Sequence, residues 1–212
     1  MRARSLFVLI ASLLTVASLW WFFTPGALRF RSFDPERVGR AEAGLWRDYY
    51  EGRPVELIVG LALNDYRAFG LSPYASFRAG LTAADAARRF QRSRSRAEAQ
   101  AALKPLTEHF RIVREAARLH IDPAEAARLE LDWWQLRRET DTVSYTPAVA
   151  RATGYLYGVP PERLANYASL RVAAMDLRDR KGRNIQASDW AEIEGLLVRA
   201  YRALRPEVIA AG

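Results

Sequence analysis

Four dipeptides of one kind punctuate this chain, each a residue with a short polar side chain followed by proline. Such a side chain accepts hydrogen bonds from the free N–H groups of a helix N-terminus, and proline suits the first helical position. The dipeptides therefore predict four helix starts, at Asp34-Pro35, Ser72-Pro73, Asp122-Pro123 and Thr146-Pro147. No alternating apolar stretch is long enough for a sheet, so the expected fold class is all-α.

Apolar residues at helical spacing, with glycines where helices should stop, define the remaining elements. They predict one compact bundle of about eight helices over residues 29–212, since neither an internal repeat nor a low-complexity segment is present. Pro105 is expected to kink or split the fourth helix, because an interior proline removes a backbone hydrogen bond. The expected helices cover residues 35–51, 54–69, 73–91, 96–120, 123–139, 147–157, 161–180 and 189–204.

The N-terminus carries an apolar run, Leu6–Phe23, of 18 residues without a charge. As a helix it would measure about 27 Å, close to the thickness of the hydrocarbon core of a bilayer. Trp20 and Trp21 match the aromatic residues found at membrane interfaces. The run predicts a single-pass signal anchor over residues 1–28. The alternative is a signal peptide cut ahead of Leu19, which would leave an exposed apolar terminus and is disfavoured for that reason.

The charges around this run bear on its orientation. Arg2 and Arg4 precede it, and a short basic head normally stays in the cytoplasm. The arginines that follow the run oppose this bias; they are Arg29, Arg31, Arg37 and Arg40. We expect an inner-membrane protein of a bacterial cell envelope, held by residues 6–23, with its helical domain in the periplasm.

Composition removes several classes of site. The chain has no cysteine, which excludes disulfides, thiolate zinc sites, cysteine nucleophiles and c-type haem attachment. His109 and His120 are eleven residues apart on one predicted helix, roughly 16 Å along its axis and too far apart to share a metal. Each is expected at the surface or its boundary. The sequence contains no glycine-rich phosphate-binding loop, no Gly-x-Ser-x-Gly nucleophile elbow and no His-Glu-x-x-His zinc-binding motif. Neither a metal nor a cofactor is therefore predicted.

Charged residues on the apolar faces of the predicted helices are the main functional signal. An isolated buried charge costs several kcal/mol, so such groups should pair with one another. Either they form ion pairs that set the helix register, or they line a polar pocket that supplies general acids, general bases or ligands for a hard cation. The candidates are Glu42, Asp65, Arg114, Glu130, Arg137, Arg171 and Glu194, with Glu130 and Asp65 as the candidate catalytic residues.

The densest basic cluster spans a predicted helix end and the turn after it, where cations suit the helix dipole. It is either a solvated helix terminus or a contact for anionic lipid headgroups. No nucleic-acid-binding module accompanies it, so nucleic acid is not an expected partner. The cluster consists of Arg88, Arg89, Arg92, Arg94 and Arg96.

Two functions remain open. The first is a membrane-tethered scaffold or interaction module that recruits an envelope protein; it predicts a closed core with ion pairs and no cavity. The second is an enzyme, or a binder of a small ligand or cation, whose site includes Glu130 and Asp65 with Glu42 and Arg137 as neighbours. It predicts an open cleft that reaches those carboxylates. The sequence names neither a substrate nor a reaction, so whether the chain is an enzyme is left open.

Overall fold

The computed structural model describes residues 2–26, 28–139 and 142–211, and the side chains from residue 12 onward apart from residues 27, 140–144 and 212. Every regular element within these ranges is helical and none is a strand, which confirms the all-α fold class. The α-helices are α1 Arg2–Phe23, α2 Pro35–Tyr50, α3 Pro54–Asn64, α4 Pro73–Arg92, α5 Arg96–Ala99, α6 Leu103–Ala117, α7 Pro123–Arg138, α8 Thr142–Tyr157, α9 Ala165–Lys181 and α10 Ala187–Ala210.

Three of the four predicted helix starts are capped as the sequence indicates. Asp34 accepts hydrogen bonds from the second and third residues of α2, Ser72 accepts one from the third residue of α4, and Asp122 accepts one from the second residue of α7. The fourth start is wrong, because α8 begins at Thr142 and carries Pro147 in its interior. The residues around this proline are buried, among them Tyr145 and Val149, and their packing outweighs the one lost hydrogen bond.

The predicted fourth helix is split, as Pro105 led us to expect. Helix α5 ends at Ala99, a 3-10 turn covers Gln100–Ala102, and α6 starts at Leu103. Pro105 is therefore the third residue of α6, where its missing N–H would have had no partner within the helix. A further departure follows α3, where a π-helical turn covers Asp65–Phe69.

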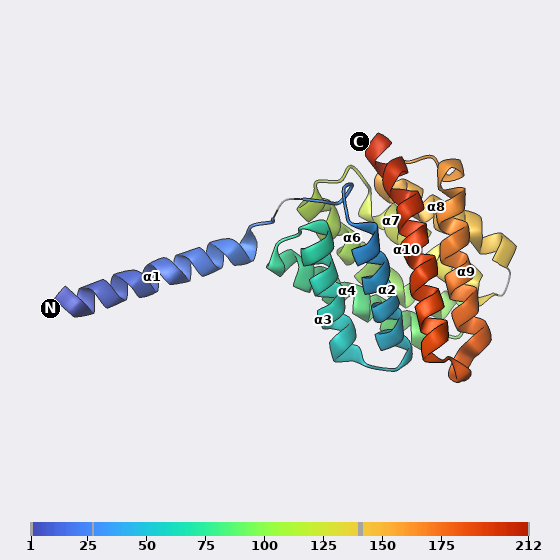
Figure 1. Cartoon of the computed structure of the whole chain (residues 1–212), viewed down its shortest axis with the longest axis horizontal. Helices are drawn as coiled ribbons and strands as arrows, with labels where there is room; N and C mark the ends of the chain where they lie inside the picture. Colours follow the sequence, from blue (N-terminus) through green and yellow to red (C-terminus); the bar gives the residue numbers. More distant parts are fainter. Residues whose placement is uncertain (1, 27, 140–141, 212) are drawn as a thin grey trace.

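The helices α2 to α10 form a closed ring. From α2 to α4 and from α6 to α10 each helix contacts the next along the chain, α4 contacts α6, and α10 returns to α2. Figure 1 shows α10 lying between α2 and α9. At the closure, a Cβ on Gly39 of α2 would lie 2.7 Å from the Val198 backbone of α10. Only glycine allows this approach, because real Cβ atoms do not come so close to backbone.

One end of the ring is filled by the largest apolar cluster. Phe33 is fully buried there and contacts the rings of Phe69, Tyr157 and Tyr201. Phe33 comes directly before the cap of α2, so this end is the one where the chain enters the ring. Burial of such aromatic side chains supplies a large share of the stabilisation of a domain of this size.

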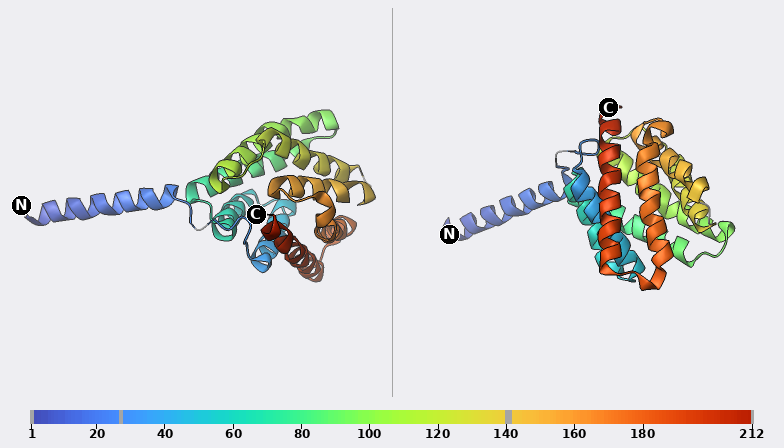
Figure 2. Two further views of the ribbon diagram at one scale, coloured as in Figure 1. Left: turned by 90° about the horizontal axis from the view of Figure 1, so that it is seen from above. Right: turned by 45° about the vertical axis from the view of Figure 1, so that its right-hand side comes forward.

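Helix α1 extends away from the ring, as both views in Figure 2 show. Its last turn contacts the ring through Trp21 against Tyr66 and through Phe22 and Phe23 against Tyr74. Among the residues whose side chains are described, no helix combines the length and the apolar character that crossing a membrane requires. Residues 6–11, which form the first third of the expected span, lie outside that set.

Candidate functional site

A cavity of about 620 Å³ lies inside the ring of helices. Residues of α2, α3, α4, α6, α7, α8, α9 and α10 line it. Most of its wall is apolar and aromatic, with Trp46, Phe90, Trp133 and Trp134 among the lining residues. A volume of this size is in the range of ordinary small-molecule sites.

One charged group in this cavity is a buried ion pair. Arg171 of α9 donates a hydrogen bond of 2.5 Å to Oε1 of Glu42 in α2, and the Tyr201 hydroxyl donates one of 2.6 Å to Oε2. Arg171 also donates to the Tyr167 hydroxyl at 3.2 Å. Its Nε is buried and has no hydrogen-bond partner in the described part of the chain. Both charges are compensated here, so the pair links α2, α9 and α10 and fits the structural interpretation of buried charge.

Glu130 of α7 lies near this pair but forms no ion pair of its own in the described part of the chain. The indole N–H of Trp134 donates a hydrogen bond of 2.9 Å to its Oε1. Burial raises the pKa of Glu130 above its usual range, and the positive charge of Arg171 opposes that rise. A raised pKa is a property that general acids and bases of the carboxyl type share.

Asp65 is the least compensated charge of the site. It is the first residue of the π-helical turn after α3, and its carboxylate has no hydrogen bond or ion pair with any described residue. The Asp65 side chain is half-buried, because part of its surface faces the space of the cavity. The cavity itself lies inside the protein, so the carboxylate is still surrounded by protein. Burial alone raises the pKa of Asp65 to about 7. The neighbouring Asn64 also lines the cavity, and no described residue donates a hydrogen bond to its buried Oδ1.

His109 of α6 presents a neutral imidazole to the cavity. Its Nδ1 is 3.0 Å from the carbonyl oxygen of Ala79. A carbonyl only accepts, so Nδ1 carries the proton and Nε2 keeps its lone pair. Burial lowers the pKa of His109, and the hydrogen bond to Ala79 opposes this shift. Nε2 has no partner among the described residues, and it can accept a hydrogen bond from a bound molecule.

The cavity opens where the C-terminal ends of four helices meet. Arg137 of α7 bonds to both carboxylate oxygens of Asp179 in α9, at 2.9 and 3.0 Å, and to the Tyr50 hydroxyl of α2 at 2.8 Å. Arg138 donates to the Phe90 carbonyl at the end of α4, at 2.6 Å. Arg138 and Asp179 line the cavity and are solvent-exposed. The opening therefore lies at the C-terminal end of α2, away from the end where α1 joins.

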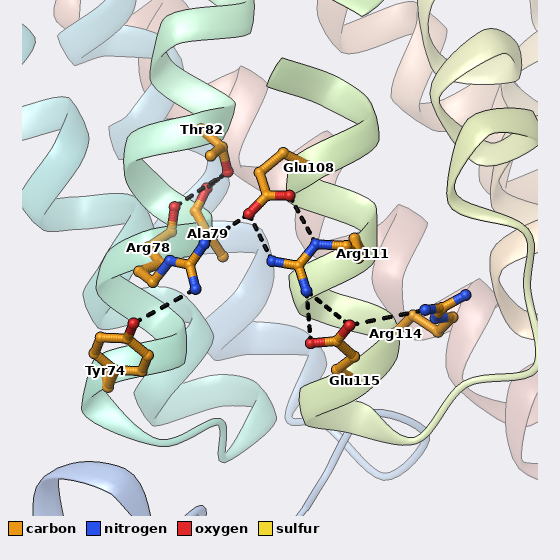
Figure 3. A network of polar contacts seen from close by, with 8 residues as sticks. All are labelled: Tyr74, Arg78, Ala79, Thr82, Glu108, Arg111, Arg114 and Glu115. Atoms are coloured by element: carbon orange, nitrogen blue, oxygen red, sulfur yellow. Dashed lines mark hydrogen bonds and ion pairs between the residues drawn. The ribbon is translucent and has the colours of Figure 1, made fainter. Parts of the chain in front are cut away.

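The structure brings five of the predicted inward-facing residues to this one cavity and places two elsewhere. Arg114 is 3.8 Å from Glu115 on the outer side of α6. It ends a surface network that joins α4 to α6 through Arg78, Glu108 and Arg111 (Figure 3). Glu194 is 45% exposed and lies 3.5 Å from Arg40, at the edge between α10 and α2. The expectation that Arg114 and Glu194 point inward is wrong, because each belongs to a helix flank. The residues that line the cavity are Glu42, Asp65, Glu130, Arg137 and Arg171.

The basic cluster of residues 88–96 is exposed and partly neutralised. Arg88 and Arg89 pair with Asp85, and Arg96 makes a two-bond contact with Glu139. The first of these arginines lies 14 residues beyond the α1 contact at Tyr74, roughly 21 Å along α4. Arg92 and Arg94 form no ion pair with the described residues. The cluster is thus nearer to the cavity opening than to α1.

Sequence reasoning missed several residues of the site. His109 was expected at the surface, but its neighbours Leu106 and Phe110 on the same helix face also line the cavity. Their spacing in the sequence was a signal that His109 faces inward. Asn64 and Arg138 had no comparable signal. In the described part of the chain, no group of three or more acidic or histidine side chains is arranged to hold a metal ion.

Comparisons with protein-family models, with curated proteins and with solved structures found no match to this chain.

Proposed function

We propose that this chain is a membrane-attached domain that binds a small, largely apolar molecule inside its ring of helices. The observation that carries the proposal is the cavity, which reaches Glu42, Asp65 and Glu130 from an opening at the surface. A scaffold whose buried charges served only to set helix register would have a closed core. The wall, with aromatic faces and a few convergent polar groups, is the usual composition of a ligand site.

Binding is tested by closing the cavity without disturbing the ring. Ala87 lines the cavity on α4, whereas Ala173 is exposed on α9. The full chain, purified in a neutral detergent, is screened for compounds that raise its melting temperature. We expect Ala87→Trp to abolish the shifts caused by the compounds found, and Ala173→Trp to leave them unchanged. Shifts that survive Ala87→Trp at full size would mean that the compounds bind elsewhere and that the cavity is not the site.

Attachment to the membrane is the second part of the proposal. Large apolar side chains of the described half of α1 are exposed, Leu14, Val16 and Trp20 each by more than 60%. The faces of α3 and α4 also expose apolar residues along their length, of which Tyr74 contacts the end of α1. These residues are Val55, Val59, Leu63, Tyr74, Phe77 and Leu81. An exposed apolar surface of this extent marks a contact with lipid or protein.

Unpaired arginines support a lipid contact at the same end. Arg29, Arg37 and Arg67 are exposed and form no ion pair with a described carboxylate. Arg37 instead donates to the backbone carbonyl oxygen of Arg67, and the Arg29 backbone N–H donates to the carbonyl oxygen of Phe69, so the three residues lie on neighbouring segments. Clustered arginines next to an apolar anchor attract anionic headgroups. With this end at the membrane, the cavity opening faces away from it.

The side of the membrane is tested with a single cysteine, because the chain has none of its own. Ala191 is exposed on α10 and is replaced by cysteine in the full chain. We propose an inner-membrane protein with a periplasmic domain. Ala191→Cys should therefore react with a membrane-impermeant maleimide in bacterial cells whose inner membrane is intact. Reaction only after lysis would place the domain in the cytoplasm, and recovery in the soluble fraction would refute attachment.

A further inference from the structure

We infer that the ligand of the cavity carries an organic ammonium group, which Asp65 receives while the aromatic wall holds an apolar body. The inference rests on the proposed binding function and names the chemical class of the ligand. It follows from an account of which charges and hydrogen-bonding atoms of the cavity are already satisfied and which are not.

The arginines of the cavity are not free to receive an anion. Arg171 is held by Glu42 and by a tyrosine hydroxyl. Arg137 is held by Asp179 in a two-bond contact. Arg138 donates to the carbonyl of Phe90, and also to the carbonyl and hydroxyl oxygens of a serine, with its guanidinium 3.8 Å from the Phe90 ring centre. The charges of Arg171 and Arg137 are thus already compensated by carboxylates, so an anionic ligand would compete with Glu42 or Asp179 for them.

Apart from Nε of Arg171, whose charge Glu42 already compensates, the unsatisfied groups that the described residues present to the cavity are acceptors. Among the described residues, none bonds to the carboxylate of Asp65, none donates to the buried Oδ1 of Asn64, and none bonds to Nε2 of His109. Glu130 accepts a hydrogen bond from the indole N–H of Trp134, and no ion pair with a described residue compensates its charge. Because the one uncompensated charge of the cavity is a carboxylate and its other free atoms are mainly acceptors, the cavity favours a ligand that supplies donors, and an ammonium group supplies up to three. Unpaired acceptors inside a protein are costly, so their satisfaction on binding favours such a ligand over one without donors.

The cation is organic because the acceptors do not form a metal site. The described acidic and histidine side chains nowhere gather in the group of three that would hold a bare ion. The walls are built for an apolar body, with Trp46, Phe69 and Phe110 lining the same space. Aromatic faces also attract organic cations directly. Burial without a counter-charge raises the pKa of Asp65 to about 7, as expected of a carboxylate that lacks the cation it would pair with.

The inference is tested with ligands that share a body and differ in the head group. Three bodies are used: octyl, 2-phenylethyl and 2-(indol-3-yl)ethyl. Each is offered as the primary amine, the alcohol and the matched carboxylate to the full chain in a neutral detergent, and dissociation constants are measured by calorimetry. We expect the amine of at least one body to bind at least about thirtyfold more tightly than its alcohol, the discrimination typical of a buried charge pair.

Variants assign the recognition to Asp65. Asp65→Asn should weaken the amine at least about thirtyfold and leave the alcohol within twofold. Asp85→Asn is the matched control, since Asp85 is on the surface of α4 and pairs with Arg88 and Arg89; it should change neither affinity. A carboxylate or alcohol that binds more tightly than the amine, or an amine affinity that Asp65→Asn does not change, overturns the inference while leaving a binding cavity in place. Absence of binding by all nine compounds, together with no hit in the melting screen, would reject the proposed function itself.

Discussion

Replacing Asp65 by Asn should make the protein more stable, and more so at high pH. The carboxylate is buried without a counter-charge, and burial raises its pKa from the ordinary 3.8 to about 7. The unfolded chain therefore loses this proton near pH 4, whereas the folded protein holds it until about pH 7. Stability contributed by the protonated form is present below pH 4 and is lost as the pH rises from there to about 7.

The size of the effect follows from the same shift. Each unit of pKa corresponds to about 1.4 kcal/mol, so ionised Asp65 costs the folded protein up to about 4 kcal/mol at pH 8. At pH 5 Asp65 costs the folded protein less than about 2 kcal/mol, because its carboxyl group is then protonated in the folded state. Asparagine has a similar shape and carries no charge at either pH. We expect Asp65→Asn to gain about 2–4 kcal/mol at pH 8, the lower figure if water fills the cavity.

Thermal unfolding followed by circular dichroism at pH 5 and pH 8 measures this directly, with the full chain in a neutral detergent. A gain of 2–4 kcal/mol corresponds to a rise in melting temperature of roughly 5–15 °C for a domain of this size. Asp85→Asn is the control of opposite sign, since it removes a surface carboxylate that pairs with two arginines, at a cost of less than about 1 kcal/mol. A gain for Asp65→Asn that is equal at both pH values would show that the pKa of Asp65 is not raised into this range. A loss at pH 8 would show that its carboxylate has a partner. Either result would refute the reasoning.

Three further outcomes are expected. Glu42→Gln should lower the free energy of unfolding in urea by about 3–5 kcal/mol, because it leaves Arg171 buried without its counter-charge; a cost below 1 kcal/mol would mean that the pair is solvated. Glu130→Gln should change the melting temperature little, since a glutamine oxygen still accepts the indole N–H and no ion pair is lost; a large loss would reveal an ion pair. Gly39→Ala should cost at least about 1–3 kcal/mol by forcing α2 away from α10, whereas Gly44→Ala, where an added Cβ meets nothing within 4 Å, should gain up to about 1 kcal/mol. Equal effects of the two glycine variants in urea unfolding would refute the close approach at the ring closure.

Local chemistry predicted most of the helices correctly. Capping residues followed by proline mark the starts of α2, α4 and α7, and they act through atoms only two or three residues away. Thr146-Pro147 failed because packing around a neighbouring buried residue, Tyr145, extends α8 past its proline. Tertiary packing can override a local signal when the cost is one backbone hydrogen bond.

The candidate site was predicted in part for a similar reason. Helical spacing identifies which side of a helix is apolar, and Glu42 and Glu130 stand on such sides and line the cavity. Helical spacing does not show which part of an apolar helix face packs against a neighbouring helix and which part borders solvent. In a ring each helix packs against two others as well as the interior, so its apolar sector is wide and its margins are solvated. Glu194 is on such a margin, which is why it pairs with Arg40 at the surface.

By itself the sequence determined that the chain is helical, where most helices begin, and that certain carboxylates and arginines stand on apolar faces. Those properties depend on residues within a few positions of one another, and they hold whatever the rest of the chain does. Only the tertiary structure decided that α10 closes on α2 and that a cavity remains inside. Closure depends on Gly39 meeting residues far along the chain, and a cavity is space that side chains from eight separate helices leave unfilled. No local pattern encodes such a space, because its existence depends on all of those side chains at once.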